Sequence, residues 1–165
     1  MELINTENKD EVILTEEGHN KLNEELNKLK NVKRNEIAER LKQAISYGDI
    51  TENSEYDDAK NEQARIEYRI DTIETILANA KVISRRQVKT KEVGIGSMVE
   101  IKQVSSGKKS QRYRIVGSAE ANAEEHSISF QSPVGQALMG LKVGDVARVS
   151  APAGEKKYRV LTIKK

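Results

Sequence analysis

Residues 48–58 read GDITENSEYDD, a short acidic segment between two long segments with helical periodicity. It contains five carboxylates and no basic residue. A helix is expected to begin at Thr15, whose hydroxyl can accept from a free backbone amide, and to extend to Ser46. A helical hairpin ordinarily ends in a loop without concentrated charge. The acidic segment therefore suggests a hairpin that carries carboxylates to a target.

Apolar residues recur every three or four positions on both sides of the acidic segment, as in the seam of a coiled coil. The first helix supplies Leu22, Leu26, Leu29, Val32, Ile37, Leu41, Ala44 and Ile45, with one slip across residues 33–36. The second supplies Tyr56, Ala59, Gln63, Ile66, Ile70, Ile73 and Leu77. Only the short link 47–52 joins them, which forces antiparallel neighbours. Residues 1–78 are therefore predicted to form an antiparallel coiled coil with the acidic segment at its far end.

Composition agrees with a slender helical domain joined to a small second domain. Of 165 residues, 36% are hydrophobic and 33% charged, which is lean for one thick core. The absence of cysteine excludes disulfides and thiolate metal sites. No apolar run approaches the roughly 20 residues that span a bilayer, and the N-terminal residues lack the features of a signal peptide. A soluble cytoplasmic protein is expected.

The net charge of +2 conceals two halves of opposite sign. Residues 1–78 carry 11 Lys and Arg against 19 Asp and Glu, whereas residues 79–165 carry 17 against 7. Such asymmetry predicts two domains with different contact surfaces, although mutual attraction of the halves is an alternative explanation.

The C-terminal half changes from helical periodicity to alternation. Residues 79–94 are predicted to be a connector with a short strand, and residues 95–165 a globular domain. Ser132 and Pro133 predict a helix start and Gly140 its end. Expected strands lie at 98–102, 112–116, 127–130, 145–149 and 158–163. The fold class is α+β, and this half shows no nucleophile–base pair, phosphate loop or metal spacing, so the chain is not expected to be an enzyme by itself.

The carboxylates of the acidic segment exceed what helix capping requires. Asp49 and Glu52 have the spacing of a capping box, but Asn53 and Ser54 are competing caps. Oxygen ligands on a turn suit Mg²⁺, which binds through one or two carboxylates plus a phosphate-bearing partner. The segment is thus predicted to be an incomplete Mg²⁺ site whose remaining ligands come from another molecule.

The sequence closely resembles the bacterial GreA transcript cleavage factor family from Val12 to Ile163. The resemblance rests first on GDITENSEY at 48–56 and AKNEQ at 59–63. It continues with YRIVG at 113–117, ISFQSPVGQAL at 128–138 and VGD at 143–145.

The resemblance implies a monomeric transcription elongation factor that binds bacterial RNA polymerase, with no membrane partner. The coiled coil would enter the secondary channel, and a C-terminal domain similar to FKBP-type folds would dock at the rim. Asp49 and Glu52 would help to hold a Mg²⁺ shared with the polymerase, with no cofactor bound stably by the factor alone. The polymerase would then cleave the nascent RNA 3′ end of a backtracked complex.

Further roles follow from the same resemblance. Asn53, Glu55 and Tyr56 are expected to support the tip. For Arg40 and Lys42, contact with RNA and a solvated surface role are both open. Polymerase docking and helix capping are both open as roles for Ser132, Pro133 and Val134.

Two other classes of protein remain as alternatives. A homologue of the same architecture could occupy the channel and inhibit the polymerase without cleavage. A coiled-coil chaperone or scaffold is the third class, although such a protein does not require a carboxylate-rich tip.

Overall fold

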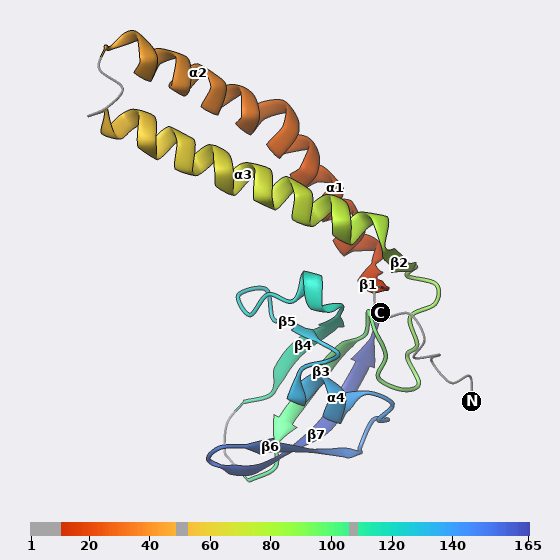
Figure 1. Ribbon diagram of the computed structural model, residues 1–165. Helices are drawn as coiled ribbons and strands as arrows, with labels where there is room; N and C mark the ends of the chain where they lie inside the picture. Colours follow the sequence, from red (N-terminus) through yellow and green to blue (C-terminus); the bar gives the residue numbers. More distant parts are fainter. Residues whose placement is uncertain (1–10, 49–52, 106–108) are drawn as a thin grey trace. The chain divides into compact units, whose positions relative to one another are not determined.

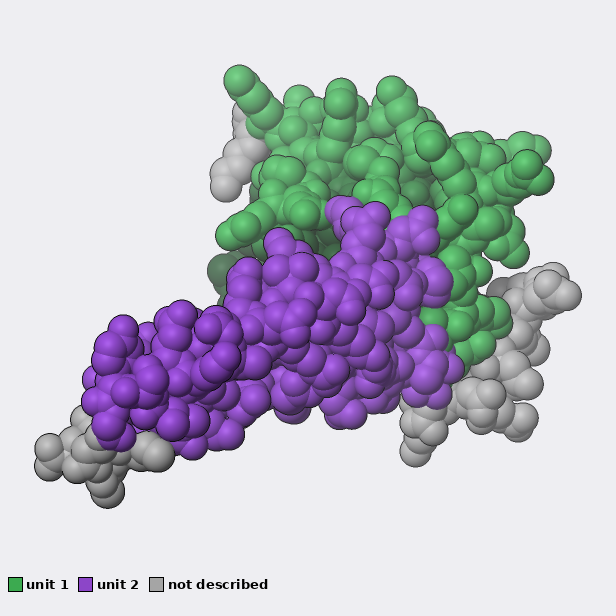
Figure 2. Space-filling view, turned by 90° about the horizontal axis from the view of Figure 1, so that it is seen from above, with its two compact units in different colours: residues 1–18, 80–165 green, residues 19–79 purple. Residues whose placement is uncertain are grey.

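The computed structural model describes residues 11–48, 53–105 and 109–165. The chain divides into two compact units, drawn in different colours in Figure 2. One consists of residues 19–79, and the other combines residues 1–18 with residues 80–165.

The unit of residues 19–79 is a helical hairpin (Figure 1). Its first arm consists of α1 (Glu16–Lys28), which begins before the unit boundary, then the π-helical turn η1 (Leu29–Lys33) and α2 (Arg34–Ser46). Its second arm is α3 (Ser54–Ala78), which at 1.5 Å per residue is roughly 38 Å long. Helices α2 and α3 lie side by side, as the predicted antiparallel pairing requires.

The predicted cap at the start of the first arm is present. The backbone N–H of Gly18 donates to Oγ1 of Thr15 at 3.1 Å, and Glu16 and Glu17 occupy the first turn of α1. This arrangement satisfies one amide that would otherwise lack a partner and places negative charge at the positive end of the helix dipole.

The π-helical turn η1 explains the slip in the seam of the first arm. A π turn inserts one extra residue and rotates the helix that follows. Leu26 before the turn, Leu29 at its first position and Ile37 after it therefore pack into one cluster with Ile66 and Ile70 of α3.

Two residues that were predicted to lie in the seam are exposed instead. Val32 lies in the π turn and is 44% exposed, and Ile45 is 51% exposed. Beyond the turn the seam uses Ala44 instead of Ile45, and the Ala44 side chain is 1% exposed.

The second unit is built on a curled five-stranded sheet with the order β5-β4-β3-β7-β6. Neighbouring strands are antiparallel except β4 and β5, which are parallel. The strands are β3 (Met98–Gln103), β4 (Gln111–Val116), β5 (Ser127–Ser129), β6 (Val146–Ala151) and β7 (Gly154–Lys164). All five expected strands are thus present within a few residues.

One face of the sheet forms the core with the short helix α4 (Pro133–Leu138). As predicted, Ser132 caps this helix, accepting from the N–H of Gly135 at 3.1 Å. Leu138 is fully buried, and the side chains that surround it alternate with exposed ones along the strands. The buried cluster includes Val93, Val99, Ile101, Ile115, Ala147, Val160 and Ile163.

A two-stranded parallel sheet was not predicted. β1 (Val12–Thr15) pairs with β2 (Ala80–Ile83), so two segments far apart in sequence meet in one unit. The carboxylate of Glu120, in the 3₁₀ turn η3 (Ser118–Glu120), accepts from the backbone N–H of Thr15 at 2.8 Å and also from its hydroxyl. A Cβ at Gly18 would lie 1.8 Å from Oε1 of Glu120, so a larger residue there would displace the Glu120 side chain from Thr15.

Among the described residues, no helix is both long and apolar enough to cross a membrane.

Candidate functional site at the end of the helical hairpin

The first arm of the hairpin ends in a defined backbone turn. The N–H of Tyr47 lies within hydrogen-bond distance of the carbonyl oxygens of Ala44 and Ile45, and Gly48 follows with φ +112°. Glycine adopts this conformation without steric cost, whereas other residues are strained in it. Gly48 therefore directs the chain out of α2 and into the acidic segment.

Asn53 closes the hairpin from the other side. Its Oδ1 accepts from the backbone N–H of Tyr56 at 3.2 Å and so caps α3. Its Nδ2 donates to the carbonyl oxygen of Ala44 at 2.8 Å, in the last turn of α2. One side chain thus satisfies a backbone donor of α3 and a backbone acceptor of α2, which ties the two helix ends together.

Small residues allow the two helices to approach closely near this end. Ala44 of α2 is 1% exposed and Ala59 of α3 is fully buried. Larger side chains at these positions would separate the helices and break the bond from Asn53 to Ala44.

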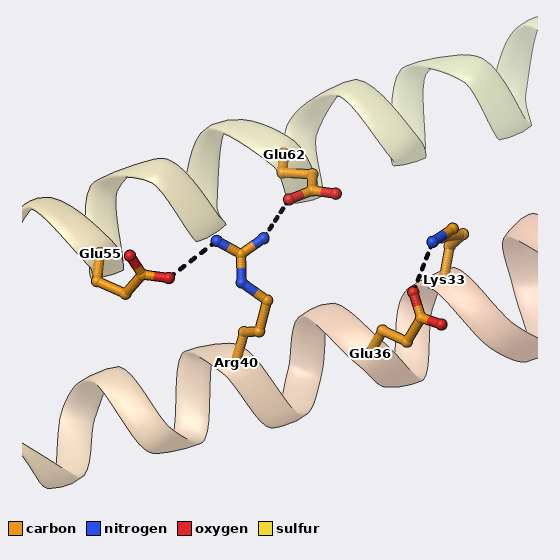
Figure 3. Close-up of polar contacts among 5 residues, drawn as sticks. All are labelled: Lys33, Glu36, Arg40, Glu55 and Glu62. Atoms are coloured by element: carbon orange, nitrogen blue, oxygen red, sulfur yellow. Dashed lines mark hydrogen bonds and ion pairs between the residues drawn. The ribbon is translucent and has the colours of Figure 1, made fainter.

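Arg40 links the two arms electrostatically (Figure 3). Its guanidinium donates to Glu55 at 3.0 Å through Nη2 and to Glu62 through Nη1, and both carboxylates project from α3. The hydrogen bond that Arg40 donates to Glu55, together with the one it donates to Glu62, raises the pKa of Arg40. Glu55 therefore faces a cation of the hairpin itself.

Other ion pairs cross between the arms away from the tip. Arg34 pairs with Glu67, Lys30 with Glu74, and Arg69 of α3 with Glu25 of α1. These side chains are each about half exposed, and ion pairs so open to solvent contribute little to stability. Their main effect is to favour one register of the hairpin over alternatives.

Several predicted tip residues can now be placed. Asp49 and Glu52 lie outside the described residues. Asn53 is half-buried in its capping role, and Glu55 is exposed and paired with Arg40. Tyr56 is half-buried at the first turn of α3 and gives its backbone N–H to Asn53.

The predicted RNA-contact residues differ in their surroundings. Arg40 is occupied by two carboxylates, whereas Lys42 is exposed on α2 without an ion-pair partner among the described residues. The predicted docking residues lie together at the start of α4: Pro133 is exposed, and Ser132 and Val134 are half-buried.

Sequence reasoning missed two features of the tip. Asn53 was assigned to helix capping and to support of the tip, and its bond to Ala44 was not foreseen. The pairing of Arg40 with Glu55 and Glu62 was also missed, although the predicted antiparallel register places these positions near each other.

The described residues offer no metal centre on their own. They contain no cluster of three or more His, Cys, Asp or Glu side chains able to hold a metal ion. Asp57 and Asp58 at the start of α3 are exposed. The predicted metal ligands Asp49 and Glu52 lie outside the residues searched.

The fold combines a helical hairpin with an acidic end and a small unit built on a curled sheet. Two family models match a protein class with these two parts. The family model described as "Transcription elongation factor, N-terminal" matches residues 12–82, and that described as "Transcription elongation factor, GreA/GreB, C-term" matches residues 88–165. The chain belongs to the GreA/GreB family of transcription elongation factors.

Individual relatives agree with this assignment. The chain is 52% identical over 155 residues to the transcription elongation factor GreA of Acetivibrio thermocellus, covering 94% of this chain and 97% of the relative. It is 54% identical over 154 residues to that of Thermoanaerobacter pseudethanolicus, covering 93% and 98%. Among solved structures, GreA factor homolog 1 of Thermus thermophilus matches with 34% identity and a TM-score of 0.43, covering 94% of this chain and 99% of the other.

Proposed function

We propose that the chain binds bacterial RNA polymerase through its secondary channel and stimulates the polymerase's own Mg²⁺-dependent cleavage of nascent RNA. The substrate is a backtracked complex in which the RNA 3′ end has been extruded from the active site. The factor supplies carboxylates and no complete active site of its own.

The observation that supports this proposal best is the closure of the hairpin around the acidic segment. Gly48 and Asn53 flank Asp49 and Glu52 in sequence, and both have defined conformations at the ends of α2 and α3. Asn53 ties together the two helix ends between which the acidic residues Asp49 and Glu52 occur in the sequence. Positioning of reacting groups is worth several kcal/mol in catalysis because the entropy cost is met before the reaction.

Asp49 and Glu52 have the donor chemistry for a shared Mg²⁺, because carboxylate oxygens are preferred ligands of this ion. A second bound metal would stabilise the attacking and leaving oxygens of a phosphodiester. The role of this chain is to present the two carboxylates at the end of the hairpin. The curled-sheet unit, including Ser132, Pro133 and Val134, would dock on the polymerase.

The experiment that tests the proposal adds the protein to a purified, backtracked elongation complex with 3′-end-labelled RNA and Mg²⁺. Release of short 3′ fragments followed by renewed extension supports stimulated cleavage. Blocked extension without shortening would show a channel-occupying inhibitor, and absence of any effect would show a scaffold.

A further inference from the structure

Tyr47, which follows the last residue of α2, carries an aromatic ring that is open to solvent. It is 83% exposed, the highest value among the large apolar and aromatic residues in the described parts of the chain. Tyr113 and Tyr158, by contrast, pack against the core of the sheet unit, and Tyr56 is half-buried at the start of α3. Because hydrophobic stabilisation grows with the area removed from water, the ring of Tyr47 contributes little to folding.

The backbone that carries this ring is held in place. The N–H of Tyr47 donates to the carbonyl oxygen of Ala44, and the N–H of Gly48 donates to that of Ile45, each at 3.4 Å. Tyr47 has φ −80° and ψ −3° and so continues the right-handed turn of the helix. A tyrosine side chain has few rotatable bonds, and ordering it against a ligand costs little conformational entropy. Tyr47 is therefore a platform with a fixed backbone and an exposed ring.

The platform lies at the end of the hairpin to which the cleavage function is assigned. The end of α2 and the start of α3 lie side by side there (Figure 1), and Asn53 joins them through its bond to Ala44. In the sequence, Tyr47 precedes Asp49 by two positions. Two residues of chain span at most about 7 Å. One nucleotide of RNA can therefore contact both the ring of Tyr47 and the carboxylate of Asp49.

The charge at this end of the hairpin determines which part of a nucleotide it can hold. Residues 43–58 contain five carboxylates and no lysine or arginine. Asp57 and Asp58 are exposed, and Glu55 is already paired with Arg40. In the absence of a metal ion such a surface repels phosphate groups, whereas the faces of the bases carry no net charge. Contact through a base is therefore the favourable way to hold RNA here.

Aromatic side chains are the usual platforms for unpaired bases. Proteins hold the bases of single-stranded RNA by stacking them on tyrosine, phenylalanine or tryptophan rings. Each stacked base is worth about 5- to 150-fold in affinity. A purine has two fused rings and a pyrimidine one, so a purine offers more area for stacking.

We propose that Tyr47 stacks on the extruded base at the RNA 3′ end and makes stimulated cleavage more efficient when that base is a purine. This inference rests on the function proposed above and adds a substrate preference to it. Tyr47 is in this account a substrate-binding residue, and the carboxylates keep the role already assigned to them.

The first test uses elongation complexes backtracked by one nucleotide, with adenine or uracil as the extruded base. The cleavage rate with the factor is divided by the rate without it, which removes the intrinsic difference between the two complexes. The parent should stimulate the adenine complex more than the uracil complex. Tyr47→Ala should lower stimulation of the adenine complex by about fivefold or more and remove the preference. Tyr47→Phe keeps the ring and should retain both.

Tyr68→Ala is the matched control. Tyr68 is also an exposed tyrosine, at 75%, but it lies roughly 21 Å along α3 from the first residue of that helix, Ser54. This variant should stimulate both complexes as the parent does. Thermal melts of the two alanine variants should match that of the parent, because neither change removes a buried side chain.

A second readout does not depend on cleavage. The fluorescent base 2-aminopurine replaces the extruded base, and the factor carries Asp49→Asn and Glu52→Gln so that the RNA stays intact. Stacking on an aromatic ring quenches this fluorescence. Addition of the factor should therefore quench it, whereas Tyr47→Ala in the same background should not, and Tyr68→Ala should quench it fully. Quenching that requires Tyr47, from a parent protein that stimulates no cleavage, would support the stacking and reject the cleavage function.

Any of three results would overturn the proposal. One is a preference for adenine, or a fluorescence quench, that is the same in Tyr47→Ala as in the parent. Another is an equal loss of stimulation in Tyr47→Ala and Tyr68→Ala. The third is that Tyr47→Ala loses affinity for a polymerase complex without extruded RNA, which would assign the ring to a contact with the polymerase.

Discussion

The side-chain amide of Asn53 donates to the carbonyl oxygen of Ala44 at 2.8 Å, at the end of the hairpin where α2 stops and α3 begins. The same side chain caps α3 through Oδ1. Asn53→Asp keeps an acceptor for the cap but places a carboxylate against the carbonyl of Ala44. Asn53→Ala removes both bonds.

We expect Asn53→Ala to lower the free energy of unfolding by about 1–2 kcal/mol, combining a lost cap with a lost hydrogen bond. Asn53→Asp should separate the two roles, with α3 still capped and the link to α2 lost. Urea unfolding followed by circular dichroism measures both variants. Equal stability of Asn53→Ala and the parent would show that the link contributes nothing.

The effect of the π-helical turn on the phase of the seam can be tested by deleting one residue from it. Removing Asn31 from η1 should convert the turn to α-helix and keep Leu29 and Ile37 on the same face, because the turn holds one residue more than an α-helix requires. The variant should remain folded, with a cooperative melt near that of the parent.

Deletion of Glu24, in the regular helix α1, is the matched control for the π turn. It rotates the preceding part of the helix by about 100° and removes Leu22 from the seam. This variant should lose much more stability. If both deletions are equally harmful, η1 does not account for the phase of the seam.

The ion pair between Glu25 and Arg69 predicts a pH dependence of stability. The hydrogen bond from Arg69 lowers the pKa of Glu25 from its ordinary value of 4.5, and the attraction of the guanidinium acts in the same direction. A carboxylate with a lowered folded-state pKa contributes stability above the unfolded value and loses it as pH falls through the folded value. The contribution should therefore be complete at neutral pH and disappear progressively below about pH 4.5.

The variant Arg69→Gln makes this effect measurable. Because the pair is about half exposed, the change should lower the free energy of unfolding by about 0.2–1 kcal/mol at pH 7. The difference from the parent should shrink as the pH is lowered toward 3. A difference that is constant from pH 7 to pH 3 would rule out the ion pair as its source.

Variants at Arg40 and Lys42 should differ in their crosslinking to RNA if the hairpin contacts extruded RNA. Lys42 is exposed and unpaired among the described residues, whereas Arg40 already binds Glu55 and Glu62. Lys42→Glu should therefore weaken crosslinking of the RNA 3′ end more than Arg40→Gln does. The latter should chiefly lower stability slightly, because it removes the ion pairs to Glu55 and Glu62. Unchanged crosslinking in both variants would make both residues part of the solvated surface.

The sequence predicted the hairpin and the sheet unit because their periodicities are long and local. Helix caps at Thr15, Asn53 and Ser132 were foreseen, since each requires only neighbouring residues. The strand at Val12–Thr15 was missed because its partner β2 lies far away in sequence and four residues carry little alternation.

Errors in the seam have a different cause. Val32 and Ile45 are apolar at plausible spacings. Val32 lies in the π turn, whereas Ile45 faces solvent beside the buried Ala44 in the regular helix α2. The bond from Asn53 to Ala44 and the pairing of Arg40 depend on the distance between two helices, which periodicity does not supply. The roles of Asp49 and Glu52 depend on a second molecule and remain predictions.

The most direct test of the account is cleavage of backtracked RNA by the double variant Asp49→Asn, Glu52→Gln. Both changes keep side-chain size and remove negative charge, so folding and polymerase affinity should stay close to those of the parent. With saturating protein and Mg²⁺, we expect release of 3′ fragments to fall to the rate of the polymerase alone. Fragment release at the parent rate, with polymerase binding intact, would contradict the assignment of these carboxylates.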